Sequence, residues 1–277
     1  MSDNFLPPEA PPTASARQID FTTTTPPIPK YARLFAGVID DILTEEECNE
    51  FIRRAEATTI PPNSTTAGTP AWERAMINIG SGRQALDTET RNCGRIILDD
   101  TVLTDKLLTR LMPFLKKWGI DQIENQLQVT GLRGRGKRYH LTRLNERLRF
   151  LKYEGGEYFR PHGDASYVTP DGKERSFYTI HLYLNGEGEQ DLEELRGERR
   201  RMVRDGEVNR DVNGRLLGGA TSFIARFEDE ENEEQVRVFP RTGSVLVFQQ
   251  MDLIHGGDPV FRGTKYTMRT DIMYRQE

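Results

Sequence analysis

The sequence is poor in the residues and segments that define several large classes of protein. Among 277 residues there are two cysteines, Cys48 and Cys93, which form no Cys-x-x-Cys motif and no disulfide framework. No stretch approaches the roughly 18 consecutive apolar residues of a membrane-spanning helix. The first residues have neither the basic nor the apolar segment of a secretory signal. We therefore expect a protein of the reducing cytoplasm, without a membrane partner.

An excess of positive charge is also lacking. The chain has 38 Lys and Arg against 43 Asp and Glu, a formal net charge of -5. Nucleic-acid-binding proteins usually carry a concentrated positive excess, so we expect no nucleic-acid partner. The basic clusters at 133–138 and 199–204 are better interpreted as solvated loops, because the second is equally rich in acids. With 36% hydrophobic residues, the length suffices for one sizeable core.

Histidine is scarce, with four in the chain. His162 and Asp164 lie two residues apart, and residues i and i+2 of an extended segment project to the same side. His255 follows Gly243–Gln250, a segment typical of a buried strand. Two histidines and one carboxylate with open coordination positions form the facial triad of non-haem Fe(II) oxygenases. A lone His-x-Asp pair is more often a pair of exposed polar residues than a metal site. The prediction of the triad therefore depends on the flanking sequence.

The flanking sequence keeps the order and spacing of a known family from about Leu148 to Tyr274. The matching motifs are Tyr153-x-x-Gly156-x-x-Phe159-x-Pro161-His162-x-Asp164, Tyr183-Leu184-Asn185, Gly218-Gly-Ala-Thr-Ser-Phe223, Pro240-x-x-Gly243-x-x-Leu246-x-Phe248, His255 and Gly263-Thr-Lys265-Tyr. Together they resemble the prolyl-4-hydroxylase-like branch of the Fe(II)/2-oxoglutarate-dependent dioxygenases. The resemblance implies a double-stranded β-helix, a jelly-roll barrel in a mainly β, α+β chain with supporting N-terminal helices. It also implies Fe(II), 2-oxoglutarate and O₂ as cofactor and cosubstrates, with ascorbate as a candidate reductant.

The resemblance assigns expected roles to particular residues. His162, Asp164 and His255 would be the catalytic metal ligands, and Lys265 would bind the distal (C5) carboxylate of 2-oxoglutarate. Tyr153, Tyr183 and Thr179 would line the cosubstrate pocket. If Lys265 points inward, strand alternation turns Arg269 and Asp271 inward too. Arg269 is then a candidate for a substrate carboxylate or the C1 end of 2-oxoglutarate, for a salt bridge with Asp271, or for the C5 carboxylate in place of Lys265.

The remaining candidates would contact the substrate. They are Arg149, His181, Asn92, Arg95 and Arg269. Members of the family keep an aliphatic residue at the position of His181, so this pocket is expected to be more polar. Phe159 replaces a second tyrosine of the family, which removes a hydroxyl there.

The chain divides into three regions. Residues 1–30, rich in Pro and Thr, are expected to be a disordered or loosely draped leader. Residues 31–277 would form a single dioxygenase domain, with helical support at 31–125 and a jelly-roll core at 126–277. A charged stretch at 186–217 has no clear period, and either a mobile lid or a solvated loop fits it. A capping box, Thr44-Glu-Glu-Glu47, predicts a helix start, and Leu127–Leu132 is predicted to be a strand.

The leading hypothesis is a hydroxylase of an unactivated C–H bond in a small molecule, such as a cyclic amino acid or a biosynthetic intermediate, with release of succinate and CO₂. A peptidyl-prolyl 4-hydroxylase acting on a protein is the first alternative. A non-catalytic metal-binding module is the second, although the intact triad with Lys265 argues against it. The sequence leaves the oligomeric state open.

Overall fold

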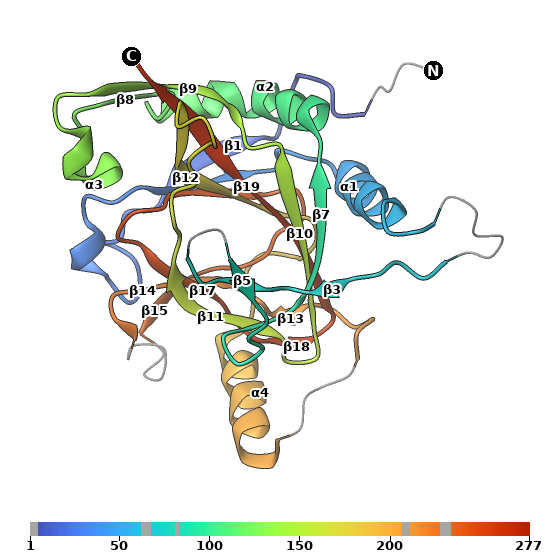
Figure 1. Ribbon diagram of the computed structural model, residues 1–277. Helices are drawn as coiled ribbons and strands as arrows, with labels where there is room; N and C mark the ends of the chain where they lie inside the picture. The colour runs from blue at the N-terminus through green and yellow to red at the C-terminus, as the bar shows by residue number, and fades with distance from the viewer. Residues whose placement is uncertain (1–4, 62–67, 81–82, 207–210, 228–233) are drawn as a thin grey trace.

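Two antiparallel β-sheets form the body of the protein (Figure 1). The structure is a computed structural model that describes residues 5–61, 68–80, 83–206, 211–227 and 234–277. In spatial order, the strands of the larger sheet are β1 (Ser15–Gln18), β2 (Ala36–Asp40), β16 (Val245–Gln249), β12 (Glu174–Tyr183), β19 (Thr264–Gln276), β10 (Arg147–Glu154), β7 (Gly94–Asp99) and β3 (Glu73–Arg74). Beside this path, β9 (Arg138–Leu144) pairs with β19, and β8 (Gln122–Glu124) pairs with β9.

The smaller sheet lies opposite the C-terminal strands of the larger one. Its order is β15 (Gln235–Val238), β14 (Thr221–Ile224), β17 (Ile254–Gly257), β11 (Tyr158–Gly163) and β6 (Arg91–Asn92). Two short ribbons pair β13 (Leu217–Gly218) with β18 (Val260–Arg262), and β4 (Ile77–Asn78) with β5 (Gln84–Ala85). From β10 onward the chain passes back and forth between the two sheets, with β10, β12, β16 and β19 in the larger one and β11, β14 and β17 in the smaller one. This alternation is that of a double-stranded β-helix, and it confirms the predicted fold class.

Two helices cover the outer face of the larger sheet, as Figure 1 shows. They are α1 (Glu45–Ala57) and α2 (Thr101–Lys117), which bury Phe51 and Leu111 among residues such as Phe150 of the sheet. The predicted capping box is present: the amide of Glu47 donates to the Thr44 hydroxyl, and the amide of Thr44 donates to the Glu47 carboxylate. Because strand residues alternate, these helices fill one face of β10, β12 and β19 with apolar residues and leave the other face for the site.

The prediction of a disordered leader is wrong for residues 5–30. Strand β1 pairs with β2, and Leu6, Ile19, Phe21 and Ile28 are buried. A few widely spaced apolar side chains, each with its own place in the core, hold a segment whose average composition is polar. Residues 1–4 lie outside the described part.

Three further segments differ from expectation. Residues Leu127–Thr130 form the short helix α3, followed by the 3₁₀ turn η2 (Leu132–Gly134), where a strand was predicted. The charged stretch contains the helix α4 (Leu192–Asp205), whose first amides are capped by the Asp191 carboxylate. Figure 1 places α4 beside β13 and β18, at one end of the molecule. The region expected to be helical support also contributes strands, among them β2, β6 and β7.

A short 3₁₀ turn, η1 (Pro29–Tyr31), links the N-terminal segment to β2. Among the helices of the described residues, none combines the length and the apolar character needed to cross a membrane.

Candidate metal centre and cosubstrate pocket

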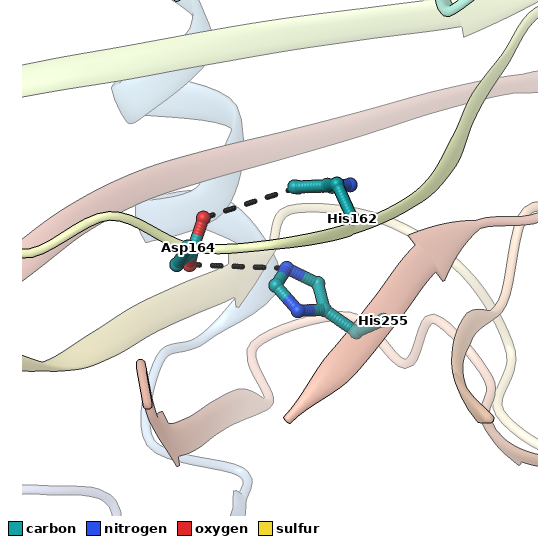
Figure 2. Close-up of side chains that lie close together, drawn as sticks. All are labelled: His162, Asp164 and His255. Atoms are coloured by element: carbon teal, nitrogen blue, oxygen red, sulfur yellow. Dashed lines mark ion pairs between the residues drawn. The ribbon is translucent and has the colours of Figure 1, made fainter. Parts of the chain in front are cut away.

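The three predicted metal ligands meet between the two sheets (Figure 2). His162 on β11 pairs in register with His255 on β17, and Asp164 follows β11 directly. The Nε2 atom of His162 lies 3.9 Å from Oδ1 of Asp164, and Nε2 of His255 lies 3.8 Å from Oδ2. Of the described His, Cys, Asp and Glu residues, these are the group whose potential ligand atoms converge, all within 4.8 Å of one another.

Both imidazoles are oriented by their surroundings. Nδ1 of His162 lies 2.9 Å from the carbonyl oxygen of Arg160, and Nδ1 of His255 lies 3.3 Å from that of Leu253. Protons on these Nδ1 atoms would donate to the carbonyls and leave each Nε2 lone pair directed at the site. Burial lowers the pKa of His162 to about 3 and also lowers the pKa of His255, so both rings are neutral at neutral pH.

The Asp164 carboxylate is fixed by two donors. The Thr179 hydroxyl donates to Oδ2 at 2.6 Å, and Nη2 of Arg269 lies 2.8 Å from the same oxygen. Burial alone would raise the pKa of Asp164, but Arg269, the two imidazoles and the Thr179 hydroxyl outweigh it and hold the pKa below its usual value. The group is therefore an anion with Oδ1 free of these two donors.

This donor set fits a ferrous ion. Neutral imidazole nitrogens and one carboxylate oxygen on one side of an ion are the ligands of the facial triad. The three donors lie close enough for small side-chain rotations to bring all of them to one ion, and the orienting contacts are those that metal-ligating histidines usually have.

The inward face of the larger sheet carries the second part of the site. Cross-strand register aligns Tyr153 with Lys265, Leu151 and Tyr183 with Thr267, and Arg149 and His181 with Arg269. Polar side chains therefore stand in successive rows along β19, starting at Lys265 and reaching the metal centre at Arg269.

Lys265 is buried, with 1% of its surface exposed. Its ammonium lies 5.0 Å from the ring centroid of Tyr153 and 5.9 Å from that of Tyr183, and no ion pair or hydrogen bond holds it among the described residues. Burial lowers its pKa to about 8, with Asp258 opposing the shift. A side chain on Gly219, which has φ +72°, would come within 2.9 Å of Lys265, so glycine makes room for this cation.

Unpartnered donors gather around this row. Among the described residues, four buried side-chain atoms lack a hydrogen-bond partner: Arg91 Nε, His181 Nε2, Thr267 Oγ1 and Arg269 Nε. Arg91, His181 and Arg269 line the same cavity as His162, His255 and Lys265, and Thr267 lies on β19 between Lys265 and Arg269. A buried polar group without a partner costs about 1–3 kcal/mol. A ligand rich in acceptor oxygens, such as 2-oxoglutarate, fits this cavity.

The other predicted site residues fall into three groups. Tyr153 lines the cavity, whereas the hydroxyl of Tyr183 donates to Thr221 at 2.7 Å. Thr179 was expected to line the cosubstrate pocket, but its hydroxyl donates to Asp164. Away from the cavity, Asn92 accepts a hydrogen bond from Arg74, and Arg95 donates to Gln84 at 3.4 Å.

The cavity also has lining residues that the sequence analysis did not propose for the site, among them Arg91, Thr221 and Phe248. Arg91 pairs with Phe159 in the backbone register, and its guanidinium lies 4.5 Å from the Phe159 ring centroid. That ring in turn stacks on His162, with 3.7 Å between centroids. Arg91 and Asn92 are neighbours on the short strand β6, so alternation puts their side chains on opposite faces. Which of the two faces the cavity could be told only once the pairing of β6 with β11 was known.

Together, the double-stranded β-helix and a triad that could hold a metal ion are the features of the non-haem iron oxygenases of this fold. Residues 148–270 match the family model described as the 2OG-Fe(II) oxygenase superfamily. This region, a little under half of the chain, is similar to that superfamily of 2-oxoglutarate-dependent dioxygenases, as the sequence motifs predicted. The family implies Fe(II), 2-oxoglutarate and O₂. No curated protein matches the chain.

Solved structures with similar folds include two prolyl hydroxylases. One is the viral collagen prolyl hydroxylase of Paramecium bursaria Chlorella virus 1 in complex with 2-oxoglutarate, with 16% identity and a TM-score of 0.47 over 87% of this chain and 96% of that chain. The other is a prolyl-4-hydroxylase of Pseudomonas putida, with 14% identity and a TM-score of 0.46 over 90% and 96%. A 2OG-Fe(II) oxygenase-family oxidoreductase of Burkholderia pseudomallei has 10% identity and a TM-score of 0.38 over 82% and 78%.

Proposed function

We propose that the protein hydroxylates an unactivated C–H bond of a small molecule. In the overall reaction the substrate, 2-oxoglutarate and O₂ give the hydroxylated product, succinate and CO₂, so one oxygen atom enters each organic product. The bound iron supplies the redox chemistry. The chain holds the metal, fixes the cosubstrate and the reacting C–H bond, and keeps water away.

His162, Asp164 and His255 are the proposed metal ligands. Two observations support this proposal. The three donor atoms converge, and the other polar atom of each side chain is held by a carbonyl, a hydroxyl or a guanidinium. Arg269 and Thr179 act as positioning residues, because they keep Oδ2 of Asp164 engaged while Oδ1 faces the site.

Lys265 is the proposed partner of the C5 carboxylate. The single observation that carries this role is a buried ammonium that forms no ion pair with any carboxylate of the described residues and that faces the cavity of the metal centre. A charge-assisted hydrogen bond with a ligand carboxylate would satisfy it. Tyr153 stands directly opposite Lys265 and forms one wall of that end of the pocket. Arg269 is the weaker candidate for the C5 carboxylate, because Asp164 and Asp271 already neutralise it.

The spacing along β19 also supports this orientation of 2-oxoglutarate. Lys265 and Arg269 are separated by roughly 13 Å of extended strand, from about 3.3 Å per residue. Their long side chains lean toward one cavity, and the unpartnered Thr267 hydroxyl stands midway. A dicarboxylate lying along the strand, with its C1 end toward the metal and Arg269, would meet donors at both ends and in the middle.

Binding of 2-oxoglutarate to protein loaded with Mn(II), measured by isothermal titration calorimetry, tests these roles. Lys265→Met should weaken 2-oxoglutarate binding at least 100-fold without changing Mn(II) affinity, and Lys265→Arg should restore part of it. Lys152→Met is the matched control, because this lysine lies on the outward face of β10 and pairs with Glu154 at 2.9 Å. Equal 2-oxoglutarate binding by Lys265→Met and wild type would refute the assignment.

Turnover tests the substrate class. With Fe(II), 2-oxoglutarate and ascorbate as the candidate reductant, free cyclic amino acids should stimulate succinate formation more than prolyl peptides do. Stimulation by peptides alone would favour the peptidyl-prolyl 4-hydroxylase alternative. No turnover in protein that holds iron would favour a non-catalytic metal-binding module.

A further inference from the structure

A second cluster of cations lies beyond the cosubstrate pocket, on the row of β19 nearest the metal. Arg149 of β10 stands directly opposite Arg269. Its side chain is largely buried, yet its polar contacts are long. Nη1 lies 3.5 Å from Oδ2 of Asp271 and 3.5 Å from the carbonyl oxygen of Arg147. A partly buried guanidinium, with 23% of its side chain exposed and two marginal contacts, retains donors for a ligand.

The carboxylate that Arg149 approaches is already shared. Asp271 also accepts from Arg269 at 3.4 Å, from Gln250 at 3.1 Å and from Asn145 at 3.3 Å. The charge of Asp271 is thus divided between two arginines. The other nearby acid, Asp164, belongs to the metal centre.

The charges of the site with metal and 2-oxoglutarate bound do not balance. A ferrous ion with Lys265, Arg269, Arg149 and the cavity residue Arg91 gives six positive charges. Asp164, Asp271 and the two carboxylates of 2-oxoglutarate give four negative charges. Two positive charges therefore remain unmatched in a largely buried site, where an uncompensated charge is costly.

Arg95 adds to this surplus. It is buried on β7, pairs in register with Leu151, and has its 3.4 Å contact with Gln84 but no ion pair among the described residues. Burial lowers its pKa, and the nearby Arg91 acts in the same direction. The inward wall of β7, β10 and β19 therefore favours an anion beside the metal centre.

We propose that Arg149, with the field of Arg95 behind it, binds the carboxylate of the substrate, and that the substrate is a small free carboxylic acid. This inference rests on the proposed function and narrows it. A guanidinium binds a carboxylate with two parallel hydrogen bonds, which would orient the molecule as well as hold it. A residue inside a peptide has no carboxylate at this position, so the same cluster would select against polypeptide substrates.

Matched acids and amides test the proposal on protein loaded with Mn(II) and N-oxalylglycine, an unreactive analogue of 2-oxoglutarate. The panel is proline, pipecolate, the other free amino acids and small monocarboxylic acids, each beside its primary amide, with N-acetylated prolyl peptide amides added. At least one acid should bind at least tenfold more tightly than its amide. Arg149→Met should abolish that preference, and Arg149→Lys should keep part of it.

Arg147→Met is the control, because this arginine is two residues away on β10 but pairs with Asp99 at the exposed edge. It should behave as wild type. Equal binding of acids and amides, no binding by any acid, equal binding of prolyl peptide amides, or an unchanged preference in Arg149→Met would each overturn the proposal. N-Oxalylglycine affinity, measured first on the same samples, separates the two claims. Failure of the wild type to bind N-oxalylglycine would contradict the proposed function. Wild-type affinity for N-oxalylglycine in Arg149→Met would show that Arg149 does not bind the cosubstrate.

Discussion

At the scale of single residues, the site combines a triad held by neighbouring polar groups with buried polar atoms that lack partners among the described residues. The triad and Lys265 could be predicted from the sequence, because their spacing follows strand alternation and a family motif. The contact of Arg269 with Asp164 could not. Alternation gives the face on which a side chain lies, but the partner depends on how the two sheets are placed. The role of Arg91 was hidden for the same reason.

Cosubstrate binding should depend on the protonation of Lys265. Its pKa is lowered to about 8, so the free pocket holds an ammonium below that pH and loses it above. Affinity for 2-oxoglutarate should be constant from pH 6 to 7.5 and should fall up to tenfold per unit above pH 8, with proton uptake on binding. Calorimetry in buffers of different ionisation enthalpy measures both effects. Lys265→Arg should remove the pH dependence, and an affinity that stays level to pH 9.5 in the wild type would contradict this account.

Loss of Arg269 should lower the free energy of unfolding more in metal-free than in metal-bound protein. Arg269→Met removes the cation that neutralises Asp164 and leaves a buried carboxylate unpaired, at a cost of about 3–5 kcal/mol. A bound metal ion takes over that neutralisation, so the loss should be smaller in metal-saturated protein. Urea unfolding of wild type and variant, with and without Mn(II), measures the difference. The same destabilisation in both states would show that Asp164 does not face the metal.

At the scale of elements, segments with a clear apolar period were predicted and polar ones were not. The strand β16 lies within the apolar segment Gly243–Gln250, and the start of α1 follows its capping box. Leu127–Thr130 is too short for alternation to be told from a single helical turn, and tertiary context decided it. The helix α4 has few apolar residues among its charges, so its apolar face was not recognised in the sequence.

The helical layer is joined by one buried ion pair. Arg110 of α2 contacts both carboxylate oxygens of Glu47 on α1, at 2.6 and 2.8 Å, and donates to the carbonyl oxygens of Pro7 and Ile42. Arg110→Met should lower the free energy of unfolding by about 3–5 kcal/mol, because it removes the cation that neutralises the Glu47 carboxylate and leaves two carbonyls without this donor.

The exposed pair of Arg138 with Glu124 is the comparison, and Arg138→Met should cost less than about 1 kcal/mol. Chemical denaturation of both variants checks this. Similar values for the two would show that the Arg110 cluster does not stabilise the helical layer.

At the scale of the whole molecule, the N-terminal segment is part of the barrel. Phe21 packs edge-to-face on Phe223, with ring centroids 5.3 Å apart. The Tyr31 hydroxyl donates to the carbonyl oxygen of Ile224 and accepts from the amide of Ile254 at 3.1 Å, next to His255. Composition alone predicted disorder here, because such contacts depend on the position of a few side chains.

Tyr31→Phe should therefore act on the metal centre as well as on stability. Removing the hydroxyl leaves a carbonyl and an amide without partners, at about 1–3 kcal/mol, and frees the strand that carries His255. We expect a lower melting temperature and weaker Mn(II) binding. Tyr266→Phe, which has no hydrogen bond of its hydroxyl among the described contacts, should change neither. Wild-type Mn(II) affinity in Tyr31→Phe would show that the N-terminal segment does not help to position the metal ligands.

The account depends most on one ion held by two histidines and an aspartate. Anaerobic equilibrium dialysis with Fe(II) measures this directly. Wild type should bind one ion per chain. Asp164→Ala and His255→Ala should lose it while circular dichroism shows them folded. His140→Ala, at an exposed histidine of β9, and His181→Gln, which lines the same cavity but is not one of the three converging donors, should retain it. One ion bound with wild-type affinity by Asp164→Ala would contradict the account.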